Sequence, residues 1–142
     1  MLAVDTNILI YAHREETDLH QPAATWLYTL AQGVQRWALP VFCIGEFVRV
    51  VTHERVFNRP STLADAATFV ERLTEAPSCE VIQPGPEFVD RLFTTAREGQ
   101  ATGNLIFDAQ IAALCAEHGV SEILTNDDDF WRFQDLRVLR LA

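Results

Sequence analysis

Hydrophobic residues are arranged along the chain in two kinds of segment, short apolar runs and longer stretches with helical spacing. Short runs bounded by polar, Gly or Pro residues predict strands, and they cover residues 2–5, 37–41, 81–82, 122–125 and 138–139. The longer stretches repeat apolar residues every three or four positions and stop near Gly or Pro, which predicts helices. These stretches cover residues 6–14, 20–33, 42–56, 62–75, 86–98 and 105–118.

Strands that alternate with helices are typical of βαβ units and a parallel sheet. The pattern therefore predicts an α/β, Rossmann-like fold with a mainly parallel sheet of about five strands flanked by helices. No repeat or long linker divides the 142 residues, so we expect one domain over residues 1–142. Neither GxGxxG nor GxxxxGK[ST] occurs, which disfavours dinucleotide binding and P-loop chemistry.

Composition narrows the class of protein. Hydrophobic residues make up 49% of the chain and charged residues 22%, which is typical of a globular protein and not of a disordered one. No apolar run approaches the ~20 residues that span a bilayer, and the segment MLAVDTNILIYAH lacks the basic start of a signal peptide. The three cysteines form no CxxC pair, so we expect neither a disulfide framework nor a zinc site, and we expect a reducing cytoplasm.

The charge balance favours cations as partners. The net charge is −9, and every basic residue is Arg. Such a chain is poorly suited to holding nucleic acid by bulk electrostatics. It is better suited to collecting cations or to binding a basic partner.

Acidic residues follow the predicted strands. Asp5 closes the first strand, and Asp127 lies two residues past the strand at 122–125. Glu46 and Asp108 lie near the starts of two helices, and the apolar neighbours of Glu46 predict that it lies beside the core. Because parallel strands end at one edge of their sheet, we expect these four carboxylates to converge there.

A group of carboxylates is unfavourable alone, because like charges raise one another's pKa values. A divalent cation relieves the repulsion, and hard oxygen ligands suit Mg²⁺ or Mn²⁺. Such a site can activate water against a phosphodiester, with Thr6, Asn7 and Thr125 orienting the carboxylates by hydrogen bonds. Taken singly, each acid has an ordinary alternative as a helix cap, a helix-dipole partner or a solvated residue.

Four segments together resemble the PIN-domain ribonucleases, and within them the VapC-type toxins of bacterial toxin–antitoxin pairs. The segments are VDTNILIYA (4–12), GEFVRV (45–50), NLIFDAQIAALCAEHGV (104–120) and ILTNDDDF (123–130). The resemblance implies a metal-dependent endoribonuclease that is usually homodimeric, cleaves RNA such as tRNA or rRNA, and is neutralised by a cognate antitoxin.

The resemblance also assigns residues. Asp5, Glu46, Asp108 and Asp127 match the four acidic positions of the family, and Asp129 matches a frequent extra acid. Asp128 departs from the pattern, since its position often holds a basic or small residue. Arg14, Arg97 and Arg132 follow or flank these segments and are candidates for contact with RNA phosphates.

Two rival functions remain. A haloacid-dehalogenase-type phosphatase also uses Asp at a strand end with Mg²⁺, but it needs a DxDx[TV] loop and a Lys. This chain has DTN and no Lys. A PIN-like binding module without activity is the second rival, and the presence of all four acids disfavours it.

Overall fold

The computed structural model describes residues 1–141, which fold around a five-stranded sheet. All neighbouring strands are parallel, in the order β3-β2-β1-β4-β5. The strands are β1 (Leu2–Val4), β2 (Trp37–Pro40), β3 (Cys79–Ile82), β4 (Glu122–Leu124) and β5 (Arg137–Leu139). The predicted parallel sheet of about five strands is therefore confirmed.

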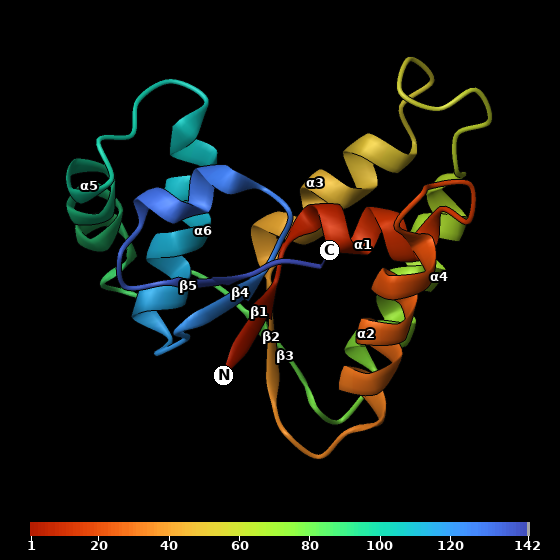
Figure 1. The fold of residues 1–142 in the computed structure, drawn as a ribbon, viewed down its shortest axis with the longest axis horizontal. Helices are drawn as coiled ribbons and strands as arrows, with labels where there is room; N and C mark the ends of the chain where they lie inside the picture. Colours follow the sequence, from red (N-terminus) through yellow and green to blue (C-terminus); the bar gives the residue numbers. More distant parts are fainter. Residues whose placement is uncertain (142) are drawn as a thin grey trace.

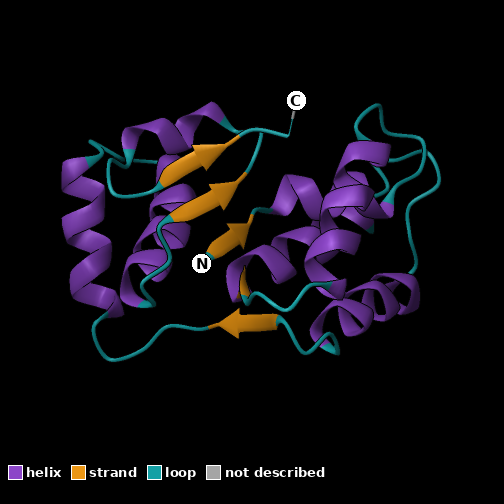
Figure 2. Ribbon diagram, turned by 60° about the horizontal axis from the view of Figure 1, so that its bottom comes forward, coloured by secondary structure: helices purple, strands orange, loops and turns teal. Residues whose placement is uncertain are grey.

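Helices cover both faces of this sheet, as expected for βαβ units. In Figures 1 and 2, α5 and α6 lie on one side of the sheet and α1, α2 and α4 on the other. The helices are α1 (Thr6–His13), α2 (His20–Gln32), α3 (Val41–Val51), α4 (Leu63–Thr74), α5 (Phe88–Glu98), α6 (Leu105–Glu117) and the 3₁₀ helix η1 (Asp128–Arg132).

The core lies between these layers. Every residue of β2 is buried, and so is the run from Ile111 to Cys115 in α6. Trp37 is completely buried, and its indole N–H donates to Ser78 Oγ at 3.1 Å, so that its polar atom is satisfied. The sheet is thus a closely packed platform for the loops at its carboxyl edge.

The strand order reverses at β1. From β1 the chain builds outward through β2 and β3, and it then returns to add β4 and β5 on the other side of β1. In such sheets ligands bind where the order reverses, outside the carboxyl ends of the strands. Asp5 lies at this point, and its amide donates to Leu124 O at 3.1 Å, which continues the β1–β4 pairing.

The helix predicted over 42–56 was wrong at its carboxyl end, because α3 stops at Val51. The carbonyl of Val51 accepts from the amide of Ser61 at 2.8 Å, and the amide of Arg55 donates to His53 Nδ1 at 3.1 Å. These bonds replace the next helical bond from Arg55 to Val51. A loop over 52–62 therefore returns the chain to the end of α1.

None of the helices in the described part of the chain has the length and apolar character that crossing a bilayer requires.

Candidate active site

Asp5 is the most buried acid at the carboxyl edge, and protein donors surround its carboxylate. Oδ1 accepts from the backbone amide of Thr6 at 2.7 Å and from the thiol of Cys43, whose sulfur lies 3.8 Å away. Oδ2 accepts from the hydroxyl of Thr125 at 2.6 Å and from the amide of Asn7 at 3.3 Å. These four donors fix the direction in which the carboxylate points.

The environment of Asp5 nevertheless opposes its ionisation. Burial raises the pKa of Asp5 from the ordinary 3.8 to about 6, although the hydrogen bonds from Thr125 and Thr6 lower it. The nearby negative charges of Glu46 and Asp127 raise this pKa further. The buried carboxylate therefore lies in a field that favours the arrival of a positive charge.

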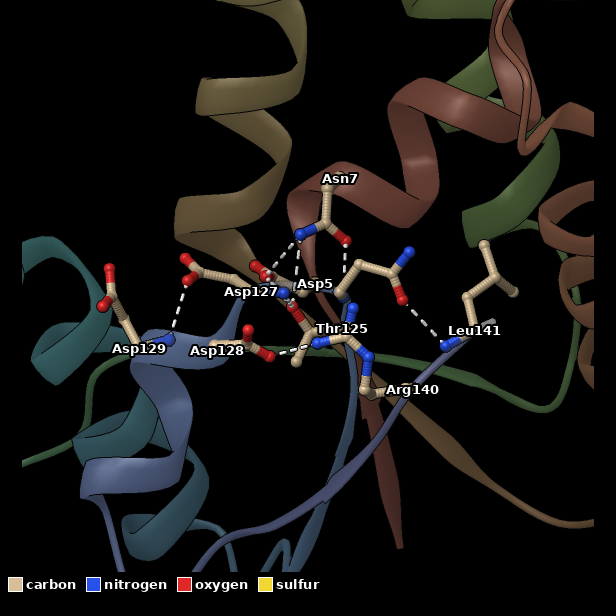
Figure 3. Close-up of polar contacts among 9 residues, drawn as sticks. Asp5, Asn7, Thr125, Asp127, Asp128, Asp129, Arg140 and Leu141 are labelled. Carbon is tan, nitrogen blue, oxygen red and sulfur yellow. Dashed lines mark hydrogen bonds and ion pairs between the residues drawn. The ribbon is translucent and has the colours of Figure 1, made fainter.

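The hydroxyl of Thr125 connects the ends of β1 and β4. It donates to Asp5, and it accepts from the amide of Asp127 at 2.9 Å and from Asn7 Nδ2 at 3.2 Å (Figure 3). Thr125 and Asn7 thus both donate hydrogen bonds to the carboxylate of Asp5. Thr6 contacts Asp5 through its backbone amide.

Three further aspartates come together beside Asp5. Asp108, Asp127 and Asp129 each place one carboxylate oxygen within 4.8 Å of the other two. Asp108 lies in the first turn of α6, and Asp127 caps η1 by accepting from the amide of Asp129 at 2.9 Å. The 3₁₀ turn therefore brings Asp129 into the group itself, where the sequence had indicated an extra acid. We call these three residues the aspartate group.

Charge repulsion within the aspartate group contributes to a raised pKa at Asp108. Its half-buried carboxyl has a pKa raised from 3.8 to about 7, first by burial and then by the charge of Asp127. Asp5, Asp129 and Glu46 add to the effect. Three carboxylates this close offer an oxygen-rich site that a divalent cation would stabilise.

Glu46 is placed differently from the prediction. We expected it beside the core, but it is the sixth residue of α3 and it is exposed. Buried positions of α3 are filled by Cys43, Phe47 and Val51, so Glu46 falls on another face of the helix. It still lies near the acidic site, because it lines a cavity together with Asp108 and its charge raises the pKa values of Asp5 and Asp108.

Asp128, which departs from the family pattern, is turned away from the aspartate group. Its carboxylate forms an ion pair with the guanidinium of Arg140, at the carboxyl-terminal end of β5 (Figure 3). The extra negative charge on η1 is therefore balanced within the chain.

The arginines predicted to contact RNA lie in unequal surroundings. Arg14 is buried and bonded to Glu16, to Ser61 Oγ and to a backbone carbonyl, so its role in this structure is to fix a loop. Arg132 donates to the carbonyl of Gly99 at 2.7 Å. Arg97 is exposed, in the last turn of α5.

Sequence reasoning missed two neighbours of the site. Cys43 donates to Asp5, and the signal for this was its position one turn before Glu46 on the same helix. Arg49, one turn after Glu46, lines a cavity with Glu46 and Asp108.

Comparison with known proteins agrees with this geometry. The PIN domain family matches residues 2–136 of the chain. Ribonuclease VapC25 of Mycobacterium tuberculosis is 33% identical over 140 residues, which cover 99% of this chain and 98% of VapC25.

Two solved structures share the fold at low sequence identity. VapBC2 from Rickettsia felis, bound to a DNA fragment of its promoter, superposes with a TM-score of 0.70 at 17% identity, covering 98% of this chain and 97% of that one. The sarcin–ricin-loop-cleaving toxin VapC20 of Mycobacterium tuberculosis superposes with a TM-score of 0.65 at 16% identity, covering 96% and 99%.

The match to the family extends over nearly the whole chain, and the acids lie at the edge where a parallel sheet of this order binds ligands. The chain belongs to the PIN-domain family. Within that family it is similar over its full length to the VapC ribonucleases.

Proposed function

We propose that this protein is a divalent-metal-dependent endoribonuclease and the toxin of a VapBC-type toxin–antitoxin pair. One observation carries the proposal. The aspartate group, with its oxygens within 4.8 Å of one another, lies next to the buried Asp5 in a chain that matches a VapC ribonuclease from end to end. Fold alone would not support an activity, because one fold serves many functions.

The donor set fits Mg²⁺ or Mn²⁺. Asp108, Asp127 and Asp129 offer only carboxylate oxygens, and hard cations prefer these ligands. The pKa of Asp108 is raised to about 7. A bound cation would lower this pKa, because it neutralises the negative charge of the group. A bound divalent ion supplies an activated water and charge stabilisation at the leaving oxygen.

The chain's own residues position this chemistry. Asp108 and Asp127 would hold the cation together with Asp129, and the ionised carboxylate of Asp5 would add a negative charge near them. Thr125 and Asn7 keep Asp5 in one orientation through bonds of 2.6 and 3.3 Å. Such supporting bonds commonly affect metal affinity or activity about 10- to 100-fold.

Partners follow from the same acidic site. The similar structure from Rickettsia felis is a VapBC complex bound to promoter DNA, and VapC20 is described as a toxin that cleaves the sarcin–ricin loop. We propose a cognate antitoxin for this chain, a structured RNA substrate of the tRNA or rRNA kind, and a homodimeric state. An antitoxin Arg placed among the carboxylates would bridge two of them and compete with the metal.

Parallel cleavage assays test the activity. Purified protein is incubated with RNA and with a small phosphate monoester, each with EDTA and after addition of Mg²⁺ or Mn²⁺. We expect RNA alone to be cut, only with metal, and not by the variant Asp5→Asn. Asp18→Asn, at an exposed loop acid, is the matched control and should cleave normally. Cleavage that persists in EDTA would overturn the mechanism, and hydrolysis of the monoester would favour a phosphatase.

A metal titration tests the antitoxin contact. If the inhibitor occupies the acidic site, its affinity falls as Mn²⁺ is added and falls again in Asp5→Asn. If the affinity is unchanged by Mn²⁺ and by Asp5→Asn, the inhibitor binds elsewhere.

A further inference from the structure

A cavity of about 520 Å³ opens between α3 and α6, directly beside the acidic site. Glu46 and Asp108 form part of its wall, so the cavity is continuous with the residues assigned to catalysis. The wall also includes Phe42, Gly45, Arg49, Asn104, Phe107 and Gln110. Volumes of this size are typical of pockets that bind small molecules or single units of a polymer.

An exposed aromatic ring stands in this wall. Phe107 precedes Asp108 in α6 and is 63% exposed, although it is one of the larger apolar side chains of the protein. Phe42 lies in the same wall, partly buried, with its ring 5.7 Å from that of the buried Phe88. An aromatic face that is open to solvent beside a nuclease site is suited to stacking against a nucleobase.

Arg49 adds a positive charge to the same cavity. It lies one helical turn after Glu46 and is exposed. Within residues 1–141, Arg49 forms no ion pair with a carboxylate. Beside so many acids, this is a suitable contact for a phosphate of the substrate.

Gly45 keeps the space next to Glu46 open. It lies inside α3, where Gly is less favourable than Ala by roughly 0.5–1 kcal/mol. A Cβ built at Gly45 would meet nothing within 4 Å, so the fold itself does not require a glycine there. The residue instead leaves room in the cavity wall for a molecule to approach α3 closely.

We propose that this cavity binds one nucleotide of single-stranded RNA next to the bond that is cut. Phe107 stacks on the base and Arg49 contacts the adjoining phosphate. Asn104, which caps α6 without a side-chain capping bond, and Gln110 offer amide groups to the base edge. The proposal rests on the proposed ribonuclease function and names how that site holds its substrate.

A second copy of the chain is the rival occupant of this face. The centre of a protein interface is usually depleted of charged residues. Here Glu46, Arg49 and Asp108 all lie in the wall, and the acids have to remain accessible for the reaction. The charges therefore favour RNA over a second copy.

Single-turnover cleavage of a short RNA, measured over a range of protein concentrations, tests the subsite. In Phe107→Ala the half-saturating protein concentration should rise roughly tenfold, the loss expected for one stacked base. In Arg49→Gln the slope of log affinity against log salt should become shallower by about 0.7, as for one lost phosphate contact. Mn²⁺ affinity should be unchanged in Phe107→Ala and should not fall in Arg49→Gln, because neither residue belongs to the aspartate group and loss of a nearby positive charge does not weaken cation binding.

Matched controls are available at exposed positions away from this cavity. Phe93→Ala removes an exposed ring from α5, and Arg72→Gln removes an exposed charge from α4. Both should retain wild-type half-saturation and salt dependence. A tenfold change in Phe93→Ala would show that loss of any exposed ring has the effect, and it would overturn the subsite.

Two further experiments identify what the cavity binds. In one experiment, single nucleotides of the RNA are replaced in turn by abasic units. Binding to the wild-type protein should weaken most when the abasic unit stands at one position near the cut. In Phe107→Ala, an abasic unit at that position should no longer weaken binding. Gly45→Leu should fill the cavity, so an abasic unit at that position should no longer weaken RNA binding, while Mn²⁺ still binds.

Three results would overturn the proposal. The first is wild-type cleavage together with unchanged half-saturation in Phe107→Ala, Arg49→Gln and Gly45→Leu, which removes the subsite and leaves the proposed function intact. The second is a change of mass in sedimentation for Phe107→Ala or Gly45→Leu, which assigns the cavity to a second copy. The third is a wild-type protein without metal-dependent RNA cleavage, which removes both proposals together.

Discussion

The two ends of α1 each bury a charged side chain, and the protein treats them in opposite ways. Arg14, at the carboxyl-terminal end, is 9% exposed, and its guanidinium contacts Glu16 at 2.8 Å, Ser61 Oγ at 3.0 Å and the ring of Phe57 at 4.3 Å. Asp5, at the amino-terminal end, is 5% exposed and receives hydrogen bonds, but the charges nearest to it are also negative.

The difference separates a structural charge from a functional one. At Arg14 the folded chain supplies the countercharge, so the end of α1 is complete without a ligand. At Asp5 the neighbouring charges of Glu46 and Asp127 are also negative, and they raise the cost of ionisation. Perturbed acids with uncompensated charge are typical of functional sites. A cation bound at this end would neutralise these charges.

Asp108→Asn should have the largest effect on activity. Removing one carboxylate of the aspartate group should lower RNA cleavage by about 100-fold or more, beyond the loss caused by a supporting residue. The metal-free variant should melt no lower than wild type, because repulsion at Asp108 is relieved. A near-normal rate removes Asp108 from the site, and a clear fall in Tm assigns it a structural role.

Thr125→Val should lower the cleavage rate, whereas a matching change at the other end of α1 should not. Its hydroxyl bonds Asp5, so its loss should lower cleavage by about 10- to 100-fold, while Thr125→Ser retains the hydroxyl and most of the rate. Ser61→Ala removes the corresponding hydroxyl beside Arg14 and should leave the rate of folded protein unchanged. Equal loss of rate in Ser61→Ala would contradict the distinction.

Arg14→Met should instead affect stability. Losing the charged hydrogen bonds of a buried guanidinium should lower the free energy of unfolding by about 2 kcal/mol, which corresponds to a Tm roughly 8 °C lower. Calorimetry and the cleavage rate per folded molecule measure the two effects separately. A variant with wild-type Tm and weakened RNA binding would return Arg14 to the RNA-contact role predicted from sequence.

The stability of the metal-free protein should depend on pH. The folded pKa values of Asp5 and Asp108, about 6 and about 7, lie above the ordinary 3.8, so the folded state binds more protons between these limits. Metal-free stability should therefore fall as pH rises from about 4 to about 7.

Bound Mn²⁺ should reverse the trend, because it binds the ionised carboxylates and releases protons. Denaturant titrations at several pH values, with EDTA or with Mn²⁺, measure both slopes. The metal-free slope should flatten in Asp108→Asn, and an unchanged slope would contradict the assignment.

Much of the fold was predictable because its signals are local. Strand segments such as residues 2–5 and 122–125 are short, apolar and separated by helical periodicity, so a parallel sheet follows from chain order. The end of α3 was not predictable in this way, since it depends on the bond between Val51 and Ser61, ten positions away.

The same distinction applies to the site. The placement of Asp5 and Asp127 was predictable, because each follows a strand and the carboxyl ends of parallel strands lie at one edge of the sheet. The exposure of Glu46 and the burial of Arg14 were not, because each depends on how separate helices and loops pack. Arg14 is held by residues 59 and 61, whose contact with α1 leaves no trace in the spacing of motifs.

The final residues of β5 and beyond lie beside the acidic edge, and this affects how the protein should be handled. The amide of Leu141 donates to Asn126 Oδ1 at 2.9 Å, and Arg140 pairs with Asp128, next to the aspartate group (Figure 3). Met1 precedes the amino-terminal end of β1, at the opposite edge of the sheet. A polyhistidine purification tag attached after residue 142 would bring imidazoles close to the aspartates and distort metal titrations. The same tag attached before Met1 would begin at the far edge.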